Sequence, residues 1–90
     1  MKWKVQYTKQ SLKFFKKSSI SIESIDHLIQ EAIKSVIHHE NTNINIVKMK
    51  GEWKNFYRIR NDGLRIILKF KHEEHIVLIH RIGWRGDVYK

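Results

Sequence analysis

Hydrophobic and polar residues alternate near the beginning of the chain. Trp3, Val5 and Tyr7 fall on one side of an extended segment, while Lys4 and its even-numbered neighbours are polar. A period of two with aromatic and β-branched residues is typical of a half-buried strand. We therefore predict a strand over residues 3–8, with one apolar face turned toward the core.

The pattern then changes to the three- and four-residue spacing of helices. Residues 9–17 place Leu12 and two phenylalanines among lysines, which predicts a short basic helix that ends at a serine pair. A longer helix is predicted from Ser21, whose hydroxyl can cap it, to about His39. Its apolar residues recur at intervals of three and four, as in an amphipathic helix. Two consecutive helices with a short connection predict a helical hairpin.

The second half of the chain has the composition of strands. The predicted strands are residues 44–50, 55–60, 64–71 and 76–82. The last of these is almost continuously apolar, as expected of a central strand covered on both faces. Asn61-Asp62-Gly63 is predicted to be a three-residue hairpin loop in which Gly63 takes a positive φ. We predict a single α+β domain over residues 1–90, of order β-α-α-β-β-β, with the helical hairpin packed on a small antiparallel sheet.

Composition limits the class of protein. Ninety residues carry 18 Lys plus Arg against 9 Asp plus Glu, a net charge of +9. This length excludes a multidomain enzyme, and 41% hydrophobic residues are enough for a core. The chain has no cysteine, no apolar run near the roughly 20 residues of a membrane helix and no signal peptide. We expect a complete cytoplasmic protein whose partner is polyanionic: nucleic acid, an acidic protein or an anionic membrane surface.

Most of the excess charge lies in the predicted sheet. Residues 48–71 contain eight basic residues against two acidic ones, or +6 in 24 residues. Because side chains alternate along a strand, Arg58 and Arg60 share a face, and the hairpin can place Arg65 beside them on one solvent-facing surface. A planar guanidinium can hold two phosphate oxygens, which favours a phosphate-binding face. The alternative is a basic sheet face that serves solubility and edge protection.

Four short motifs resemble toxins of the RelE/ParE superfamily, the toxin halves of bacterial type II toxin–antitoxin pairs. The opening strand and the helical hairpin match the family's order as well. The motifs follow one another within 42 residues as Lys48-Met49-Lys50-Gly51, Phe56-Tyr57-Arg58-Ile59-Arg60, Gly63-Leu64-Arg65-Ile66-Ile67 and Arg85-Gly86-Asp87-Val88-Tyr89. The resemblance implies the RelE/ParE-like fold.

The resemblance also implies a function. RelE-like members are endoribonucleases that cut mRNA in the ribosomal A site, and ParE-like members poison DNA gyrase. The RelE-type catalytic set corresponds here to Arg58, Arg60, Arg65, Arg85 and Tyr89. Its presence favours the nuclease branch, with mRNA, the ribosome and an acidic antitoxin as partners and no small-molecule cofactor. The alternatives are a ParE-like gyrase inhibitor and a non-catalytic nucleic-acid-binding member.

One departure from the family concerns the proton acceptor. RelE-type members carry lysines at the first two catalytic positions, where this chain has arginines, and arginine is a poor base because it keeps its proton. Catalysis can then rest on orientation and electrostatics, or on a lysine whose pKa neighbouring cations lower, Lys48, Lys50 or Lys54. These three lysines are also expected to bind RNA, together with Lys69.

The six histidines have simpler explanations. His72 and His75 have a spacing that suits a metal, but only two glutamates accompany them, so we expect no metal site. His80 is most simply a structural residue of a buried strand. Its alternative role is that of a general base, because histidine titrates near neutrality. The tryptophans, Trp53 and Trp84 included, are expected to serve packing more than base stacking.

Overall fold

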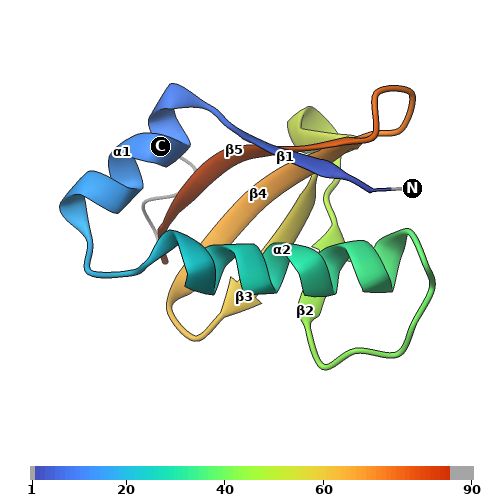
Figure 1. Cartoon of the computed structure of the whole chain (residues 1–90), viewed down its shortest axis with the longest axis horizontal. Helices are drawn as coiled ribbons and strands as arrows, with labels where there is room; N and C mark the ends of the chain where they lie inside the picture. The colour runs from blue at the N-terminus through green and yellow to red at the C-terminus, as the bar shows by residue number, and fades with distance from the viewer. Residues whose placement is uncertain (1, 86–90) are drawn as a thin grey trace.

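The chain begins with a strand, continues through two helices and then forms a series of further strands (Figure 1). The computed structural model describes residues 2–85. Its elements are β1 (Lys4–Tyr7), α1 (Lys9–Lys17), α2 (Ile22–Val36), β2 (Asn45–Lys48), the 3₁₀ turn η1 (Gly51–Trp53), β3 (Tyr57–Asn61), β4 (Leu64–Lys71) and β5 (Ile76–Trp84). Within these residues, no helix is long and apolar enough to cross a membrane.

Both helices begin where a side chain caps them. Thr8 accepts a hydrogen bond from the Ser11 backbone N–H at the start of α1, and Ser21 accepts one from the Ser24 N–H at the start of α2. Helix α1 has the predicted bounds. Helix α2 ends at Val36, before the predicted end, and His39 then takes a left-handed φ of 56°.

The strands form one mixed sheet of order β1-β5-β4-β3-β2. The predicted α+β class, with two helices packed on a sheet, is confirmed, but two details differ. The five strands of residues 2–85 correspond to the five predicted segments, of which the predicted order β-α-α-β-β-β counts only four. In addition, β1 pairs with β5 in parallel, where an antiparallel sheet was predicted, so that Val5 lies opposite Val77. A parallel pair needs a long crossover connection, and the chain between β1 and β5 supplies one.

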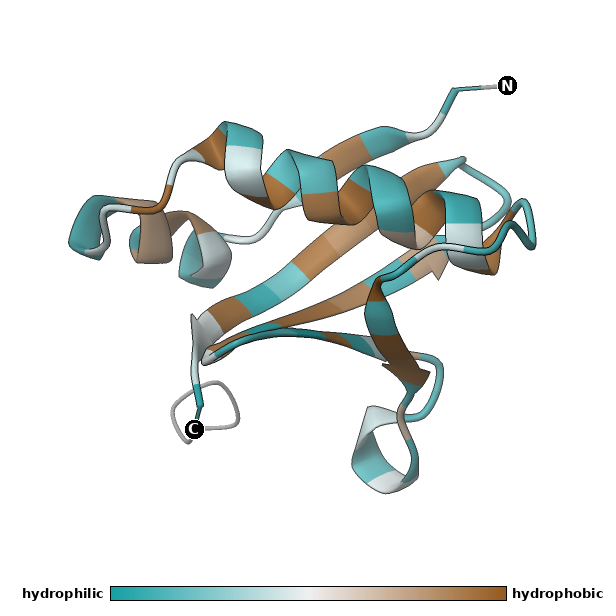
Figure 2. Cartoon of the chain, turned by 90° about the horizontal axis from the view of Figure 1, so that it is seen from below, coloured by the Kyte–Doolittle hydropathy of each residue, from teal (hydrophilic) through white to brown (hydrophobic). Residues whose placement is uncertain are grey.

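The two faces of the sheet differ in what covers them. Both helices lie on one side, which we call the helix face, and η1 lies on the other, which we call the distal face (Figure 2). The apolar side of α2 meets the helix face through Ile25, Ile29 and Ala32, each fully buried. Strand β4 is the most buried strand, whereas β5 was predicted to be covered on both faces. The high burial of β4 is not evident from its sequence because basic residues interrupt its apolar run.

The hairpin between β3 and β4 is tighter than predicted. Asn61 pairs with Leu64, so only Asp62 and Gly63 form the loop. The left-handed conformation falls on Asp62, with a φ of 55°, and Gly63 does not adopt it. The predicted three-residue loop with a positive φ at the glycine is therefore wrong, although the hairpin itself forms between the predicted strands.

Candidate nucleic-acid interface

Strand alternation gathers basic side chains on the distal face. On the three adjacent strands β3, β4 and β5, every charged residue of this face is a cation. The residues of the distal face are Phe56, Arg58, Arg60, Arg65, Ile67, Lys69, Lys71, Ile76, Leu78, His80 and Arg81. The surface that the structure offers to a polyanion is therefore a cationic sheet face.

The strand register arranges these cations in rows. Arg58, Ile67 and Arg81 lie side by side on β3, β4 and β5, which puts the two arginines roughly 10 Å apart across two strand spacings. Ile67 between them is fully buried, although it lies outside the main core cluster. Arg60 and Arg65 form the next row. Guanidinium groups in neighbouring rows can bind successive charges of a phosphate backbone.

A β-bulge brings two residues of β5 to the same face. Ile67 pairs with Arg81 and Leu68 pairs with Ile79, so His80 is the extra residue on β5. Two hydrogen bonds from Thr8 hold the bulge: its hydroxyl donates to the His80 carbonyl at 2.7 Å, and its backbone N–H donates to the Ile79 carbonyl at 3.1 Å. Without the bulge, strict alternation would turn Arg81 into the apolar core.

Aromatic rings stand among the cations of the distal face. The Trp53 ring, from η1, lies 5.5 Å from the Phe56 ring and 5.5 Å from the His80 ring. The Arg81 guanidinium lies 5.4 Å from the Trp53 ring centroid, and Lys69 Nζ lies 5.5 Å from that of Phe56. These are cation–π distances. The combination of cations and ring faces suits a single-stranded nucleic acid, which offers both phosphates and bases.

Arg65 does not lie on the solvent-facing surface that the sequence predicts. Its side chain is 8% exposed, and Nη1 donates to the carbonyls of Asp62 at 2.6 Å and Leu64 at 2.9 Å. The turn carries backbone acceptors that a charged donor satisfies well, so the guanidinium folds back onto its own hairpin. Arg58 is half-buried and Arg60 is exposed, so the distal face presents two of the three predicted arginines of the hairpin.

The remaining predicted residues lie around this face. Arg85 is exposed after β5, and its backbone N–H donates to the Gly63 carbonyl at 2.7 Å, which brings it to the β3–β4 hairpin. Tyr89 lies outside the described residues.

The four lysines predicted to bind RNA do not all lie on the distal face. Lys50 and Lys54 are exposed on either side of η1, Lys69 is on the distal face, and Lys48 pairs with the helix-face residue Tyr57.

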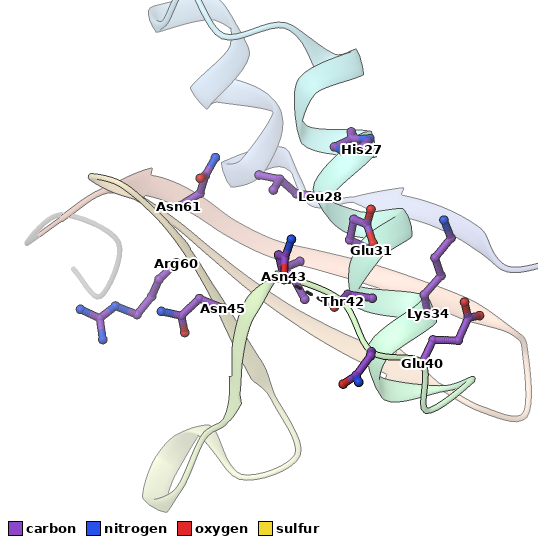
Figure 3. Close-up of a pocket in the computed structure, with 12 residues that line it drawn as sticks. His27, Leu28, Glu31, Lys34, Glu40, Thr42, Asn43, Asn45, Arg60 and Asn61 are labelled. Carbon is purple, nitrogen blue, oxygen red and sulfur yellow. Dashed lines mark hydrogen bonds between the residues drawn. The ribbon is translucent and has the colours of Figure 1, made fainter.

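A separate cavity opens beside β2. It has a volume of about 600 Å³ and lies between α2, the loop that follows it and the ends of β2 and β3 (Figure 3). Glu31, Lys34 and Glu40 line one side, and Arg60 borders the cavity at β3 with its guanidinium pointing away from it. Because its charges have both signs and it shares only Arg60 with the predicted residues, the distal face is the better candidate. Residues 2–85 hold no group of three or more side chains suited to a metal ion.

The structure brings out residues that the sequence analysis did not select. Arg81 was not predicted to belong to the site, and Trp53 was expected to serve packing. One signal was available for Arg81: a charged residue in an apolar strand cannot enter the core, so alternation must break near it. The position of Trp53 over β5 is a contact between distant segments, which the sequence pattern does not encode.

Comparison with solved structures identifies the fold. No family model matches the chain, and no curated protein matches its sequence. A chain of the archaeal RelE–RelB complex from Pyrococcus horikoshii OT3 matches with a TM-score of 0.64 at 19% identity, covering 98% of this chain and 100% of that one. A chain of the RelB–RelE antitoxin–toxin complex from Methanococcus jannaschii gives 0.61 at 20% identity, covering 93% and 94%. A metal-bound toxin from Helicobacter pylori gives 0.67 at 15% identity, covering 94% and 97%.

The chain has the fold of RelE-like toxins. The predicted resemblance is thus confirmed for the fold, and the RelE-like fold extends over nearly the whole chain and nearly the whole of each neighbour. A fold by itself does not determine an activity, which must be argued from the site.

Proposed function

We propose that this chain is the toxin of a type II toxin–antitoxin pair and that it cleaves mRNA on the ribosome. The observation that carries the proposal is the distal face, where Arg58, Arg60 and Arg81 lie on adjacent strands beside the aromatic rings of Trp53 and Phe56. The RelE-like fold and the four motifs that resemble this family support the same function.

The chemistry needs a held phosphate. Cleavage of RNA by its own 2′-OH places extra negative charge on the phosphate oxygens in the transition state. Arg58 and Arg60 would bind these oxygens, and preorganised cations stabilise such charge strongly. Arg85 would hold the phosphate or the leaving oxygen from the hairpin side. Arg65 would act as a positioning residue, since it fastens the turn between the strands that carry the other arginines. Tyr89 would stack on a base.

The proposed partner is an acidic antitoxin. Two of the structural neighbours come from complexes of RelE with RelB. A net charge of +9, much of it on the distal face, favours a polyanionic protein that covers this face. Antitoxin and mRNA would then exclude each other, which explains how the antitoxin would inhibit the toxin.

Primer extension on a defined mRNA, with and without translating ribosomes, tests the proposal. We expect cuts only with ribosomes present, and a cleavage rate about 100-fold lower for Arg58→Ala because one phosphate-binding cation is lost. Lys34→Ala is the matched control, since it removes an exposed cation from α2 and should cleave at the unchanged rate.

Three results would contradict the proposal. Cleavage of RNA in the absence of ribosomes would show that the reaction does not depend on the ribosome. Unimpaired translation together with trapped gyrase–DNA breaks would indicate a gyrase inhibitor. Growth inhibition that persists unchanged in Arg58→Ala and Arg85→Ala would indicate a non-catalytic protein.

A further inference from the structure

The distal face carries a nitrogen base among its cations. His80 is the extra residue of the β5 bulge. It is next to Arg81 and therefore close to the row formed by Arg58, Ile67 and Arg81. Its side chain is half-buried, and Thr8 ties its backbone carbonyl to the start of α1. An anchored bulge of this kind re-aims a side chain at a site.

Rings surround the imidazole on two sides. The His80 ring lies 5.5 Å from the Trp53 ring and 5.2 Å from the Phe56 ring. The two aromatic neighbours reach it from different elements, η1 and the start of β3. They fix the orientation of the imidazole and reduce its contact with water.

The surroundings of His80 favour its neutral form. Burial lowers the pKa of His80 below its ordinary 6.5, and the charge of Arg81 lowers it further. The other charged groups of the neighbouring elements are mostly cations: Arg58 on β3, Lys69 on β4 and Lys54 after η1, against Glu52 in η1. Imidazole is therefore ready to accept a proton at neutral pH.

We propose that His80 is the general base of the cleavage reaction, the group that takes the proton from the 2′-OH of the RNA. This inference rests on the proposed function. As the imidazole nitrogen takes the proton, the 2′-oxygen forms a bond to phosphorus and the bond from phosphorus to the 5′-oxygen breaks. Water protonates the leaving 5′-oxygen, and the imidazolium returns its proton to water. The products are a 2′,3′-cyclic phosphate and a 5′-hydroxyl.

His80 can act as the proton acceptor, a role that the arginines of the distal face cannot perform. Arginine holds its proton too firmly to act as a base. Lys48, Lys50 and Lys54, the other candidates for this role, are all exposed, whereas His80 is half-buried among the cations of the distal face. Within residues 2–85, His80 is the histidine that the bulge places on the distal face.

The test measures ribosome-dependent cleavage of one mRNA between pH 5 and pH 9. We expect the wild-type rate to rise to a plateau with an apparent pKa below 6.5. We expect His80→Gln to lose at least about 100-fold in rate, together with this pH step. Added imidazole should restore part of the rate to His80→Ala. His27→Gln, an exposed histidine of α2, is the matched control and should behave as wild type.

Two measurements separate catalysis from structure. Thermal unfolding checks that His80→Gln folds, and binding to ribosomes that carry an uncleavable 2′-deoxy mRNA should stay within about twofold of wild type, since a general base contributes to the transition state. If wild type cleaves and His80→Gln cleaves equally well, with the same pH step, His80 is not the base and the proposed function stands. If wild type does not cleave under any condition, both proposals fail.

Discussion

The two faces of one sheet have opposite chemistry although the same strands form both. The side chains that turn toward the helices on β3 and β4 are apolar and buried, and they include Ile59, Leu64 and Ile66. Arg58 and Arg60, on either side of Ile59, turn away from the helices. The helix face is closed by α2, and the distal face carries cations and a few aromatic rings. A change of one residue in register would exchange the two sets of side chains.

The comparison shows how a small domain combines stability with a charged site. Cations gathered on one face repel one another, and the distal face carries Arg58, Arg60 and Arg81 on neighbouring strands. The helix face must offset this repulsion through its buried apolar area. Stability and site chemistry should therefore respond to different substitutions along the same strand.

The largest expected effect is on the helix face. Ile66→Ala removes a fully buried side chain from the core and should lower the free energy of unfolding by about 3 kcal/mol. Ile76→Ala makes the same chemical change at a half-buried position of the distal face and should cost about 1 kcal/mol or less. Urea unfolding followed by circular dichroism measures both. Equal losses would mean that the core extends through both faces of the sheet.

A smaller effect on stability should distinguish two arginines of the β3–β4 hairpin. Arg65→Ala should lower the free energy of unfolding by about 1–2 kcal/mol, because Nη1 no longer bonds to the Asp62 and Leu64 carbonyls. Arg60→Ala, directly across the hairpin, removes an exposed arginine and should change stability by less than about 0.5 kcal/mol. The same unfolding assay compares them. A larger loss for Arg60→Ala than for Arg65→Ala would contradict the structural role of Arg65.

The helix face was more predictable from the sequence than the distal face. Helix α1 has the predicted bounds because local signals define it, a threonine cap and a change of period. The shared face of Arg58 and Arg60 follows from alternation alone. The parallel pairing of β1 with β5, the bulge at His80 and the fold of Arg65 onto its turn depend on contacts between distant segments or on backbone acceptors. Sequence periodicity does not contain these contacts.

The smallest expected effects compare the two faces by pH. His80 lies on the distal face, and burial followed by the charge of Arg81 lowers its pKa below 6.5. Tyr7 lies on the helix face against Phe15, and burial followed by the charge of Asp26 raises its pKa above 10.0. Each shift links stability to pH, because the folded and unfolded states bind different numbers of protons.

The two residues should reduce stability at opposite ends of the pH range. As pH falls below 6.5, the unfolded state binds a proton at His80 before the folded state does, so stability decreases until the folded pKa is passed. As pH rises above 10.0, the unfolded state loses the Tyr7 proton first, and stability decreases again. Unfolding midpoints across pH should show both decreases, with the acid one reduced in His80→Gln and the alkaline one in Tyr7→Phe. If the loss of stability at low pH persists in full in His80→Gln, another group causes it. The opposite pH responses could then not be assigned to the two faces of the sheet.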